Sequence, residues 1–456
     1  MSIPTFLIVG RPNVGKSTLF NRLTGSKKSI VFDYPGVTRD LIFSYGHWEN
    51  HNYLLVDSGG VFFDKTLDTD TVPSHLKDFQ QIIEHKVKQA VVESDLIFFL
   101  VDARDGLTPY DKVISSYLQP WKNKVLLVVN KTDLTRTDSE NATFYECGFE
   151  TLLNVSATTS KGMDDLLEIA FKTLPDYNQG LNKLDNDNAI KVAIVGRPNV
   201  GKSSMINAIL GQEKTIVSEI PGTTRDSTDH LKKHNKENYL FIDTAGLKKK
   251  SKNAKDIDFY SYIRTLRSLY ECDIALLILD ASEKITDQDK HIASLIEENR
   301  KCLLIIVNKW DLVPKESTIT EKYTEYIYHQ LQFIQYAPIL YISAITKKRL
   351  DNIYEKIKTI FTESKKKIPQ KQLNEFIKRY IKYSKNPAIN SGRGKIYFIK
   401  QDKVKPFELN LYVNKSTYFN SAIIRHFITN FRKQFGFSGC PLSVQVKAVK
   451  DKKTRV

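Results

Sequence analysis

The segment GRPNVGKST, from Gly10 to Thr18, returns almost unchanged as GRPNVGKSS from Gly196 to Ser204. Each copy follows a short apolar run, FLIV before the first and AIV before the second. A strand, a glycine-rich loop with Gly-Lys-Ser and a following helix form the context in which a phosphate-binding P-loop is expected. A fortuitous Gly-Lys-Ser turn is the alternative, and the duplication argues against it. The repeat therefore predicts two nucleotide sites in one chain.

The glycines, the lysine and the serine of each predicted P-loop have different expected roles. Its glycines let the backbone N–H groups wrap a phosphate, and the following helix adds its positive end. We expect Lys16 and Lys202 to reach the β- and γ-phosphates, and the hydroxyls of Ser17 and Ser203 to bind magnesium. The predicted P-loop residues are Gly10, Arg11, Pro12, Asn13, Val14, Gly15, Lys16, Ser17 and Thr18, and Gly196, Arg197, Pro198, Asn199, Val200, Gly201, Lys202, Ser203 and Ser204.

Two further motifs follow each P-loop in the same order. PGVTRD and PGTTRD place Thr38 and Thr224 where a hydroxyl can complete the magnesium shell, although a single Pro-Gly-Thr loop is usually only a loop. Asp57 and Asp243 end apolar strands, from which each carboxylate can reach magnesium, usually through water. The predicted residues of these Asp-x-x-Gly motifs are Asp57, Ser58, Gly59, Gly60, Asp243, Thr244, Ala245 and Gly246. The recurrence of the whole ordered set favours function over chance.

A third pair of motifs, NKTD and NKWD, selects the base. The carboxylates of Asp133 and Asp311 can accept two hydrogen bonds from the N1–H and exocyclic amine of guanine, a donor pair that adenine lacks. A site with such unpaired groups discriminates by about 10⁴-fold in comparable cases, so the pattern predicts GTP rather than ATP. A backbone N–H after the last strand can meet the guanine O6. The predicted residues are Asn130, Lys131, Asp133, Ser156, Ala157, Asn308, Lys309, Asp311, Ser343 and Ala344.

The spacing of these landmarks shows a domain duplication. The P-loop, the Pro-Gly turn and the Asp-x-x-Gly motif recur after 186 residues, and the NKxD motif recurs after 178. Near-continuous apolar runs, such as LIFFLVD and IALLILD, alternate with helical stretches in both copies. Strands buried on both faces read this way. We therefore predict an α/β class with two mostly parallel sheets, each with helices on both faces.

Composition shifts set the predicted domain boundaries. Residues 174–188 are rich in Asn, Asp and Gly without periodicity, which predicts a flexible linker. A lysine run and Pro369 precede a final segment that reads helix, strand, strand, helix, strand. The predicted domains are residues 1–173, a linker at 174–188, a second domain at 189–364 and a small α+β domain at 365–456.

The positive charge lies almost entirely in the last domain. Residues 364–456 hold 22 Lys and Arg against 4 Asp and Glu, a net charge of +18, whereas the whole chain carries +16. The other 363 residues therefore carry −2. Cationic residues interleave with aromatic ones around Tyr380, Tyr383, Phe398 and Phe431, although part of that aromatic content belongs to a core. The pattern favours contact with a polyanion over a merely solvated surface.

Cysteine usage and hydropathy exclude several classes of protein. Cys147, Cys272, Cys302 and Cys440 lie far apart in the sequence, which argues against a zinc site and a disulfide framework. No apolar stretch approaches the roughly 18–20 residues of a membrane span, and the chain starts directly with a predicted strand. We expect a cytoplasmic protein without a membrane span, and a monomer.

The complete motif set resembles the EngA/Der family of ribosome-assembly GTPases, with two GTPase domains followed by a basic domain. The resemblance covers essentially the whole chain. It implies a KH-like C-terminal domain, association with the large ribosomal subunit and its ribosomal RNA, and hydrolysis of GTP and water to GDP and phosphate with Mg²⁺. The residues expected to act on the γ-phosphate are Lys16, Thr38, Gly60, Lys202, Thr224 and Gly246.

Hydrolysis needs a group other than the usual glutamine. The position after each Asp-x-x-Gly motif holds Val61 or Leu247, and neither side chain can orient a water. The sequence resembles GTPases that use potassium instead, held by a P-loop asparagine, which matches Asn13 and Asn199. We therefore expect potassium-stimulated activity. The alternative is a slow switch that waits for a residue from a partner.

A Gly-x-x-Gly motif bears on how RNA is bound. KH domains grip RNA with such a loop between two helices. The match here, from Gly436 to Gly439, lies between a predicted helix and the last strand, so we expect binding through a charged face instead. Two alternative functions remain: a GTP-dependent RNA-modification partner, which has one GTPase domain, or a scaffold in which one domain is regulatory and does not hydrolyse GTP.

Overall fold

The computed structural model describes residues 3–25, 30–31, 42–58, 90–134, 138–174, 189–211, 229–235, 237–242, 254–314, 318–383 and 394–449. The chain divides into two compact units, residues 1–184 with 251–267 and residues 185–250 with 268–456. Each unit is described by itself below. The predicted domain boundaries stay predictions.

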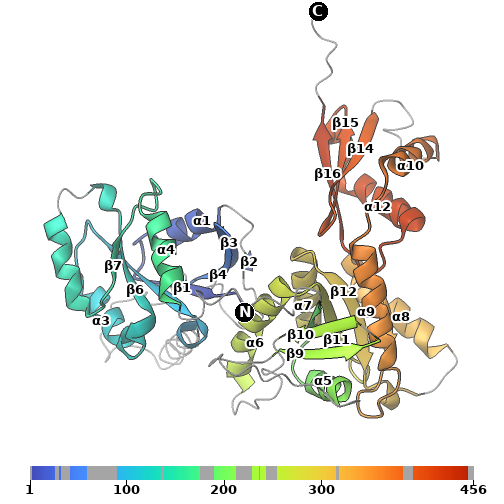
Figure 1. Ribbon diagram of the computed structural model, residues 1–456, viewed down its shortest axis with the longest axis horizontal. Helices are drawn as coiled ribbons and strands as arrows, with labels where there is room; N and C mark the ends of the chain where they lie inside the picture. Colours follow the sequence, from blue (N-terminus) through green and yellow to red (C-terminus); the bar gives the residue numbers. More distant parts are fainter. Residues whose placement is uncertain are drawn as a thin grey trace, which may run out of the picture. The chain divides into compact units, whose positions relative to one another are not determined.

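The first unit contains a seven-stranded sheet in the order β2-β3-β4-β1-β5-β6-β7 (Figure 1). Its central strands pair in parallel, as the apolar runs predict, and every residue of β1, β5 and β6 is buried. The strands are β1 Thr5–Val9, β2 Ile30–Val31, β3 Ile42–Trp48, β4 His51–Asp57, β5 Leu96–Asp102, β6 Val125–Asn130 and β7 Leu152–Asn154. The helices are α1 Lys16–Thr24, α3 Pro109–Leu118 and α4 Met163–Thr173.

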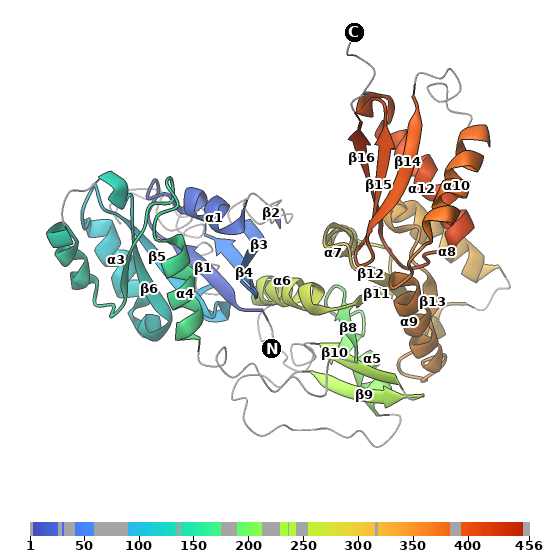
Figure 2. The same ribbon diagram turned by 45° about the horizontal axis from the view of Figure 1, so that its top comes forward.

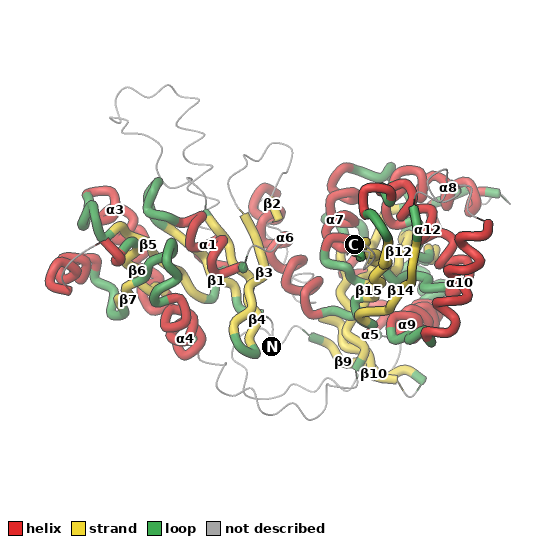
Figure 3. Tube along the Cα trace, turned by 90° about the horizontal axis from the view of Figure 1, so that it is seen from above, coloured by secondary structure: helices red, strands yellow, loops and turns green. Residues whose placement is uncertain are grey.

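The second unit repeats this plan with a six-stranded sheet in the order β13-β12-β11-β8-β10-β9 (Figure 1). The strands are β8 Ile190–Val195, β9 His230–His234, β10 Glu237–Ile242, β11 Ile274–Asp280, β12 Cys302–Asn308 and β13 Ile339–Tyr341. The helices are α5 Lys202–Leu210, α6 Ala254–Glu271, α7 Asp287–Glu298, α8 Ile319–Gln330 and α9 Asp351–Ser364. Helices and strands alternate through both copies, as Figure 3 shows, so the predicted α/β class is confirmed.

Short 3-10 segments connect several of these elements. They are η1 Gln119–Lys124, η2 Thr132–Leu134, η3 Asp138–Cys147, η6 Trp310–Leu312, η7 Gln332–Ile334 and η8 Ser416–Tyr418. Helices α3 and α7 both begin with a capping box, in which the threonine hydroxyl accepts from the backbone N–H of an aspartate three residues later. The aspartate carboxylate in turn accepts a hydrogen bond from the threonine N–H. The two copies therefore share their helix starts as well as their loops.

The sequence analysis did not identify the antiparallel strands β3 and β9. Strand β3 lies between β2 and β4 and pairs antiparallel with both, and β9 pairs antiparallel with β10 at the edge of its sheet. Their sequences, IFSYGHW and HLKKH, lack the long apolar run of the central parallel strands. Hydrophobicity alone therefore finds the parallel strands of each sheet better than the antiparallel ones.

Helix α6 crosses the boundary between the compact units at residue 267. In its first part, within unit 1, the Arg267 guanidinium donates to Asp95 at 2.6 Å. The Tyr45 hydroxyl on β3 donates to the Leu266 carbonyl at 2.8 Å. This helix follows the second Asp-x-x-Gly motif in sequence, yet part of it belongs to the unit that contains the first sheet. The sequence pattern gave no sign of that arrangement.

The C-terminal domain has the predicted order of elements. They are α10 Gln370–Tyr383, β14 Ile396–Lys403, β15 Phe407–Val413, α12 Ser421–Phe435 and β16 Leu442–Ala448. Strand β15 pairs antiparallel with β14 and parallel with β16, and the two helices pack against one face of this sheet (Figure 2). Phe376 of α10 meets Phe427 and Phe431 of α12 edge-on, both at 5.3 Å between ring centroids. The core of this domain is continuous with that of the second sheet.

The Gly-x-x-Gly loop is part of that continuous core. Phe437 is fully buried, and its backbone N–H donates to the Glu363 carboxylate of α9 at 2.6 Å. The Gly439 carbonyl accepts from the Leu303 N–H of β12 at 2.7 Å. Because a Cβ on Gly439 would lie 2.7 Å from the Ile360 side chain, only glycine fits here at φ +73°. The loop lies between α12 and β16, as the sequence predicts, and joins the domain to the second GTPase module.

Candidate nucleotide-binding sites

Both P-loops have the same left-handed backbone. Asn13 and Gly15 have φ values of 67° and 100°, and Asn199 and Gly201 have 65° and 94°. A Cβ at Gly15 would lie 2.4 Å from the Asn130 amide nitrogen, so the loop is closed against that side chain. Such a turn directs successive N–H groups into one concavity, the arrangement that binds phosphate oxygens. The sequence repeat is therefore also a repeat of local conformation.

The P-loop lysines fold back over their own loops. The Lys16 ammonium donates to the Gly10 and Arg11 carbonyls, both at 2.9 Å. The Lys202 ammonium donates to Gly196 and Arg197 at 2.6 and 2.7 Å. Burial lowers the pKa of each lysine from 10.5 to about 8. Each ammonium group is thus held at the mouth of the loop, where a phosphate can replace the carbonyl acceptors.

The first site brings together a hydroxyl and a carboxylate suited to magnesium. The Ser17 hydroxyl donates to the Asp57 carboxylate at 3.1 Å, and Asp57 is fully buried. Hard oxygen ligands of this kind fit Mg²⁺. In the second site Ser203 has the matching position at the start of α5. In the part of the chain that the structure describes, no cluster of three or more His, Cys, Asp or Glu is placed to hold a metal.

One asparagine in each module links the phosphate loop to the base-recognition loops. The Asn130 amide nitrogen donates to the Val14 carbonyl at 2.8 Å, and its oxygen accepts from the Ala157 N–H at 3.0 Å. Asn308 makes the equivalent bonds to Val200 and Ala344 at 2.9 and 3.1 Å. The N–H groups predicted to meet the guanine O6 are thus directed at these asparagines. Their contact with the base stays a prediction.

The neighbouring lysines and aspartates complete the base pocket. Lys131 and Lys309 both have left-handed backbone. The Lys131 ammonium donates to the Asn13 carbonyl of the P-loop, and the Lys309 ammonium donates to the Asp280 carboxylate at the end of β11. Asp133 is exposed, and a hydrogen bond from the Ser156 hydroxyl lowers the pKa of its carboxyl. Asp311 is also exposed. Both carboxylates predicted to read the base are therefore open to solvent, where a ligand can reach them.

Several predicted site residues lie outside the described part of the chain. They are Thr38, Gly59, Gly60, Thr224, Asp243, Thr244, Ala245 and Gly246, together with Val61 and Leu247. Ser58 is described and buried. The roles of the undescribed residues stay predictions.

The structure adds acidic partners for the predicted P-loop arginines and NKxD lysines, and sequence analysis missed these partners. Arg11 pairs with Asp105 at 2.5 Å and with the buried Asp111 at 3.5 Å. Arg197 makes the matching pairs with Glu283 and Asp289 at 2.5 and 3.3 Å. A strand-end carboxylate also meets each NKxD lysine, from Asp102 to Lys131 and from Asp280 to Lys309. These positions recur in both copies, so a residue-by-residue comparison of the repeats would have revealed them.

Comparisons with known proteins agree with this geometry. Residues 5–131 and 191–309 each match the family model described as "50S ribosome-binding GTPase", and residues 367–447 match "KH-domain-like of EngA bacterial GTPase enzymes, C-terminal". The chain is 39% identical to GTPase Der of Heliobacterium modesticaldum over 442 residues, 97% of each chain. It is 40% identical to GTPase Der of Halothermothrix orenii over 448 residues, 98% of this chain and 99% of the relative.

Among solved structures, Era from Aquifex aeolicus is similar at 24% identity, with a TM-score of 0.30. The alignment covers 57% of this chain and 93% of Era. In the described residues, no helix has the length and hydropathy needed to cross a bilayer.

Replacing the linking asparagine tests the first site. Asn130→Ala leaves the buried Val14 carbonyl and Ala157 N–H without partners, which costs about 1–3 kcal/mol per group. We expect GDP binding at the first site to weaken by about 10- to 100-fold, while the second site keeps its affinity. Titration calorimetry on the full chain measures both sites. In the matched control Asn308→Ala, GDP binding at the second site should weaken while the first site keeps its affinity. Unchanged affinity at the substituted site would contradict the role.

The lysine pKa predicts a pH dependence of nucleotide binding. In the protein without nucleotide, Lys16 and Lys202 are protonated below about pH 8 and lose their protons above it. A bound phosphate keeps both side chains protonated. Binding must therefore take up a proton above the pKa of about 8, and affinity falls by up to about tenfold per pH unit there. Calorimetry between pH 7 and 8.5 measures this, with Lys122→Ala on the exposed η1 as control. A flat profile would count against the assignment.

Proposed function

The chain belongs to the Der (EngA) family of GTPases, and from that premise we propose that it is a GTP-hydrolysing switch with two nucleotide sites. The role we infer is assembly of the large ribosomal subunit, through nucleotide-dependent binding to ribosomal RNA. The observation that carries this proposal is the repeated site. In both modules an asparagine side chain joins a closed P-loop to the loop after the last parallel strand.

The described residues supply binding and charge stabilisation. Lys16 and Lys202 would leave their loop carbonyls for the phosphate oxygens, where positive charge counters the charge that develops on the transferred phosphoryl group. Ser17 and Asp57 would hold Mg²⁺, which neutralises phosphate charge when bound. The carboxylates of Asp133 and Asp311 would read the guanine edge. The P-loop lysine and the base-reading aspartate are described in both modules, so we propose that both bind GTP.

We propose that potassium completes the catalytic charge. Asn13 and Asn199 stand at the same left-handed position of the two P-loops, beside the phosphate-binding glycines. In related GTPases with a hydrophobic residue after Asp-x-x-Gly, the matching asparagine holds the ion. A potassium ion bound there would supply the positive charge that an arginine finger supplies elsewhere.

The RNA contact is proposed for the C-terminal domain, and the structure separates its surface aromatics from its core. Tyr380 and Phe431 are buried, and Arg432 donates to the Phe437 and Cys440 carbonyls, so these residues are structural. Tyr397 and Phe398 on β14 are 40% and 44% exposed.

Phe398 stacks on Tyr412 of β15 with ring centroids 4.1 Å apart, next to the exposed Lys400. This face of β14 and β15 offers π surfaces for bases together with a cation for phosphates. Phosphate contacts supply most sequence-independent affinity, and the domain carries the excess positive charge of the chain. We therefore propose this face as part of the RNA contact.

Turnover in different salts tests the potassium proposal. We expect GTP hydrolysis to be about tenfold or more faster in potassium chloride than in sodium chloride, because a fixed positive charge stabilises the transition state. Asn13→Ala and Asn199→Ala should each remove the potassium effect at one site. Asn123→Ala, an exposed asparagine on η1, is the control. Equal rates in the two salts would refute the potassium proposal and leave GTP binding untouched.

Sedimentation with large ribosomal subunits tests the switch. We expect the attached fraction to differ between a GTP analogue, GDP and no nucleotide, since only a state-dependent complex makes the chain a switch. Attachment that ignores the nucleotide would contradict the proposal.

A salt titration of binding to ribosomal RNA tests the proposed face. Lys400→Ala should lower the slope of log affinity against log salt by about one, because one phosphate contact is lost. Phe398→Ala should weaken binding while the slope stays the same, and Lys122→Ala in the first module is the neutral control. A shallow slope for the unmodified chain would indicate a protein partner instead.

A further inference from the structure

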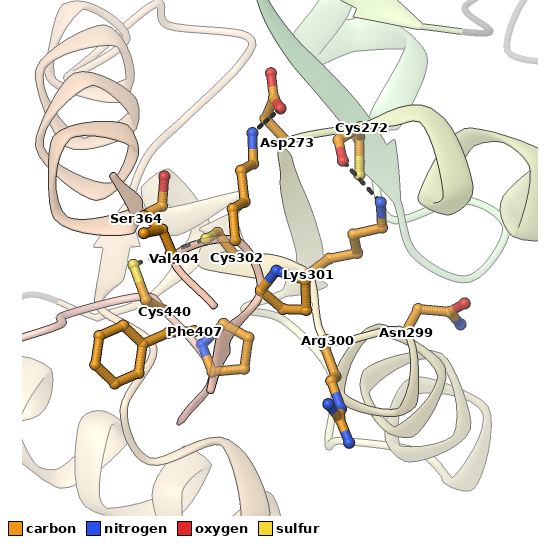
Figure 4. Close-up of a pocket in the computed structure, with 13 residues that line it drawn as sticks. Cys272, Asp273, Asn299, Arg300, Lys301, Cys302, Ser364, Val404, Phe407 and Cys440 are labelled. Atoms are coloured by element: carbon orange, nitrogen blue, oxygen red, sulfur yellow. Dashed lines mark hydrogen bonds and ion pairs between the residues drawn. The ribbon is translucent and has the colours of Figure 1, made fainter. Parts of the chain in front are cut away.

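A small cavity of about 80 Å³ lies where the second GTPase module meets the C-terminal domain, inside one compact unit. Three of the four cysteines of the chain, Cys272, Cys302 and Cys440, line it. Lys301 and Lys405 also line the cavity, and the Lys405 ammonium pairs with Asp273 (Figure 4). Neither the GTPase motifs nor the RNA contact uses these residues.

Two of the thiols touch across the junction. The sulfur atoms of Cys302, at the start of β12, and Cys440, before β16, lie 3.7 Å apart (Figure 4). Both side chains are buried, with 6% and 2% exposed. The residues are 138 positions apart in sequence, so their contact depends on the packing of the C-terminal domain against the second module.

The backbone beside the thiols is hydrogen-bonded across the same junction. The Leu303 N–H donates to the Gly439 carbonyl at 2.7 Å, and these residues directly follow Cys302 and directly precede Cys440. The two sulfur atoms are 3.7 Å apart, and a disulfide needs them at about 2 Å. The thiol pair is therefore held close to bonding distance by contacts that already exist at this junction.

The surroundings distinguish Cys302 from the other thiols. The hydrogen-bonding contact with the Cys440 sulfur lowers the pKa of Cys302 against the opposing effects of burial and of Asp273, and Lys405 and Lys301 lower it further. Pairing with Cys302, followed by burial, raises the pKa of Cys440. Burial raises the pKa of Cys272 to about 12 and that of Cys147 to about 11. Since the thiolate is the reactive form, Cys302 is the nucleophile of this group.

We propose that Cys302 and Cys440 form a reversible disulfide when a small hydroperoxide enters this cavity, fastening the C-terminal domain to the second GTPase module. The Cys302 thiolate attacks the peroxide O–O bond, which yields a sulfenic acid and, after proton uptake, releases water or an alcohol. The Cys440 sulfur then attacks the Cys302 sulfur, the S–S bond forms, and a second water leaves with the thiol proton. Two thiols lose two electrons in total, and the peroxide gains them.

The bond would act on a junction that hydrogen bonds already hold. Arg432 donates to the Phe437 and Cys440 carbonyls, and Glu363 accepts from the Phe437 N–H. A covalent link between residues so far apart in sequence restricts the unfolded chain more than the folded one. The oxidised protein should therefore hold the C-terminal domain in this position more firmly. The inference does not depend on GTP hydrolysis.

Thiol counting and peptide mapping test the proposal on the reduced full chain. After treatment with hydrogen peroxide and alkylation in denaturant, we expect the count of free thiols to fall from four to two. Non-reducing proteolysis should yield one cross-linked peptide pair containing Cys302 and Cys440, and dithiothreitol should restore all four thiols. The midpoint of thermal unfolding of the oxidised chain should rise and then return after reduction.

Two serine variants make the result specific. Cys272 lines the same cavity but is not part of the proposed pair. The Cys272→Ser variant should therefore still lose two thiols to the Cys302–Cys440 cross-link. Cys440→Ser should form no cross-link and should leave a sulfenic acid at Cys302 that dimedone traps. The proposal is overturned if Cys302 and Cys440 remain alkylated while other cysteines oxidise, or if the disulfides join separate chains. Because the count on the unmodified chain needs no variant, poor folding of a variant does not leave the proposal undecided.

Discussion

The two-sided hydrogen bonding of Asn130 and Asn308 is the constraint on which both nucleotide sites depend. Each amide donates to a P-loop carbonyl and accepts from the N–H of the loop after the last parallel strand. In the first module, Asn130 lies 116 residues after Val14 of the P-loop and 27 residues before Ala157 of the loop after the last strand. A buried amide with both ends satisfied fixes their separation, so the phosphate pocket and the base pocket form as one structure.

Around each asparagine the charges are arranged so that a ligand can replace protein contacts. The P-loop lysine donates hydrogen bonds to two backbone carbonyls, and the NKxD lysine donates to a carboxylate at the end of a strand. The P-loop arginine reaches toward the capping aspartate of the next helix. Burial keeps the pKa of Lys16 and Lys202 near 8, which makes the free site sensitive to the negative charge of a phosphate. The same charged pairs recur in both modules.

The C-terminal domain joins the second module through a shared core and a glycine loop. The Gly436–Gly439 loop places Phe437 between the two parts, where Arg432 and Glu363 hold its backbone. A motif that binds RNA in other domains is thus used here to connect a basic surface to a GTPase. The Cys302 and Cys440 thiols lie beside this hydrogen-bonded connection.

The sequence by itself determined the central strands, the two P-loops, the base-selecting motifs and the order of C-terminal elements, because local periodicity and short motifs encode them. It did not identify the antiparallel strands β3 and β9, which lack the long apolar runs of the parallel strands, or the division of α6 between the units. Only the tertiary structure decided that Tyr380 is core while Phe398 is surface, and that Cys302 meets Cys440 across 138 residues. Such contacts depend on how distant segments pack, and no local pattern carries that information.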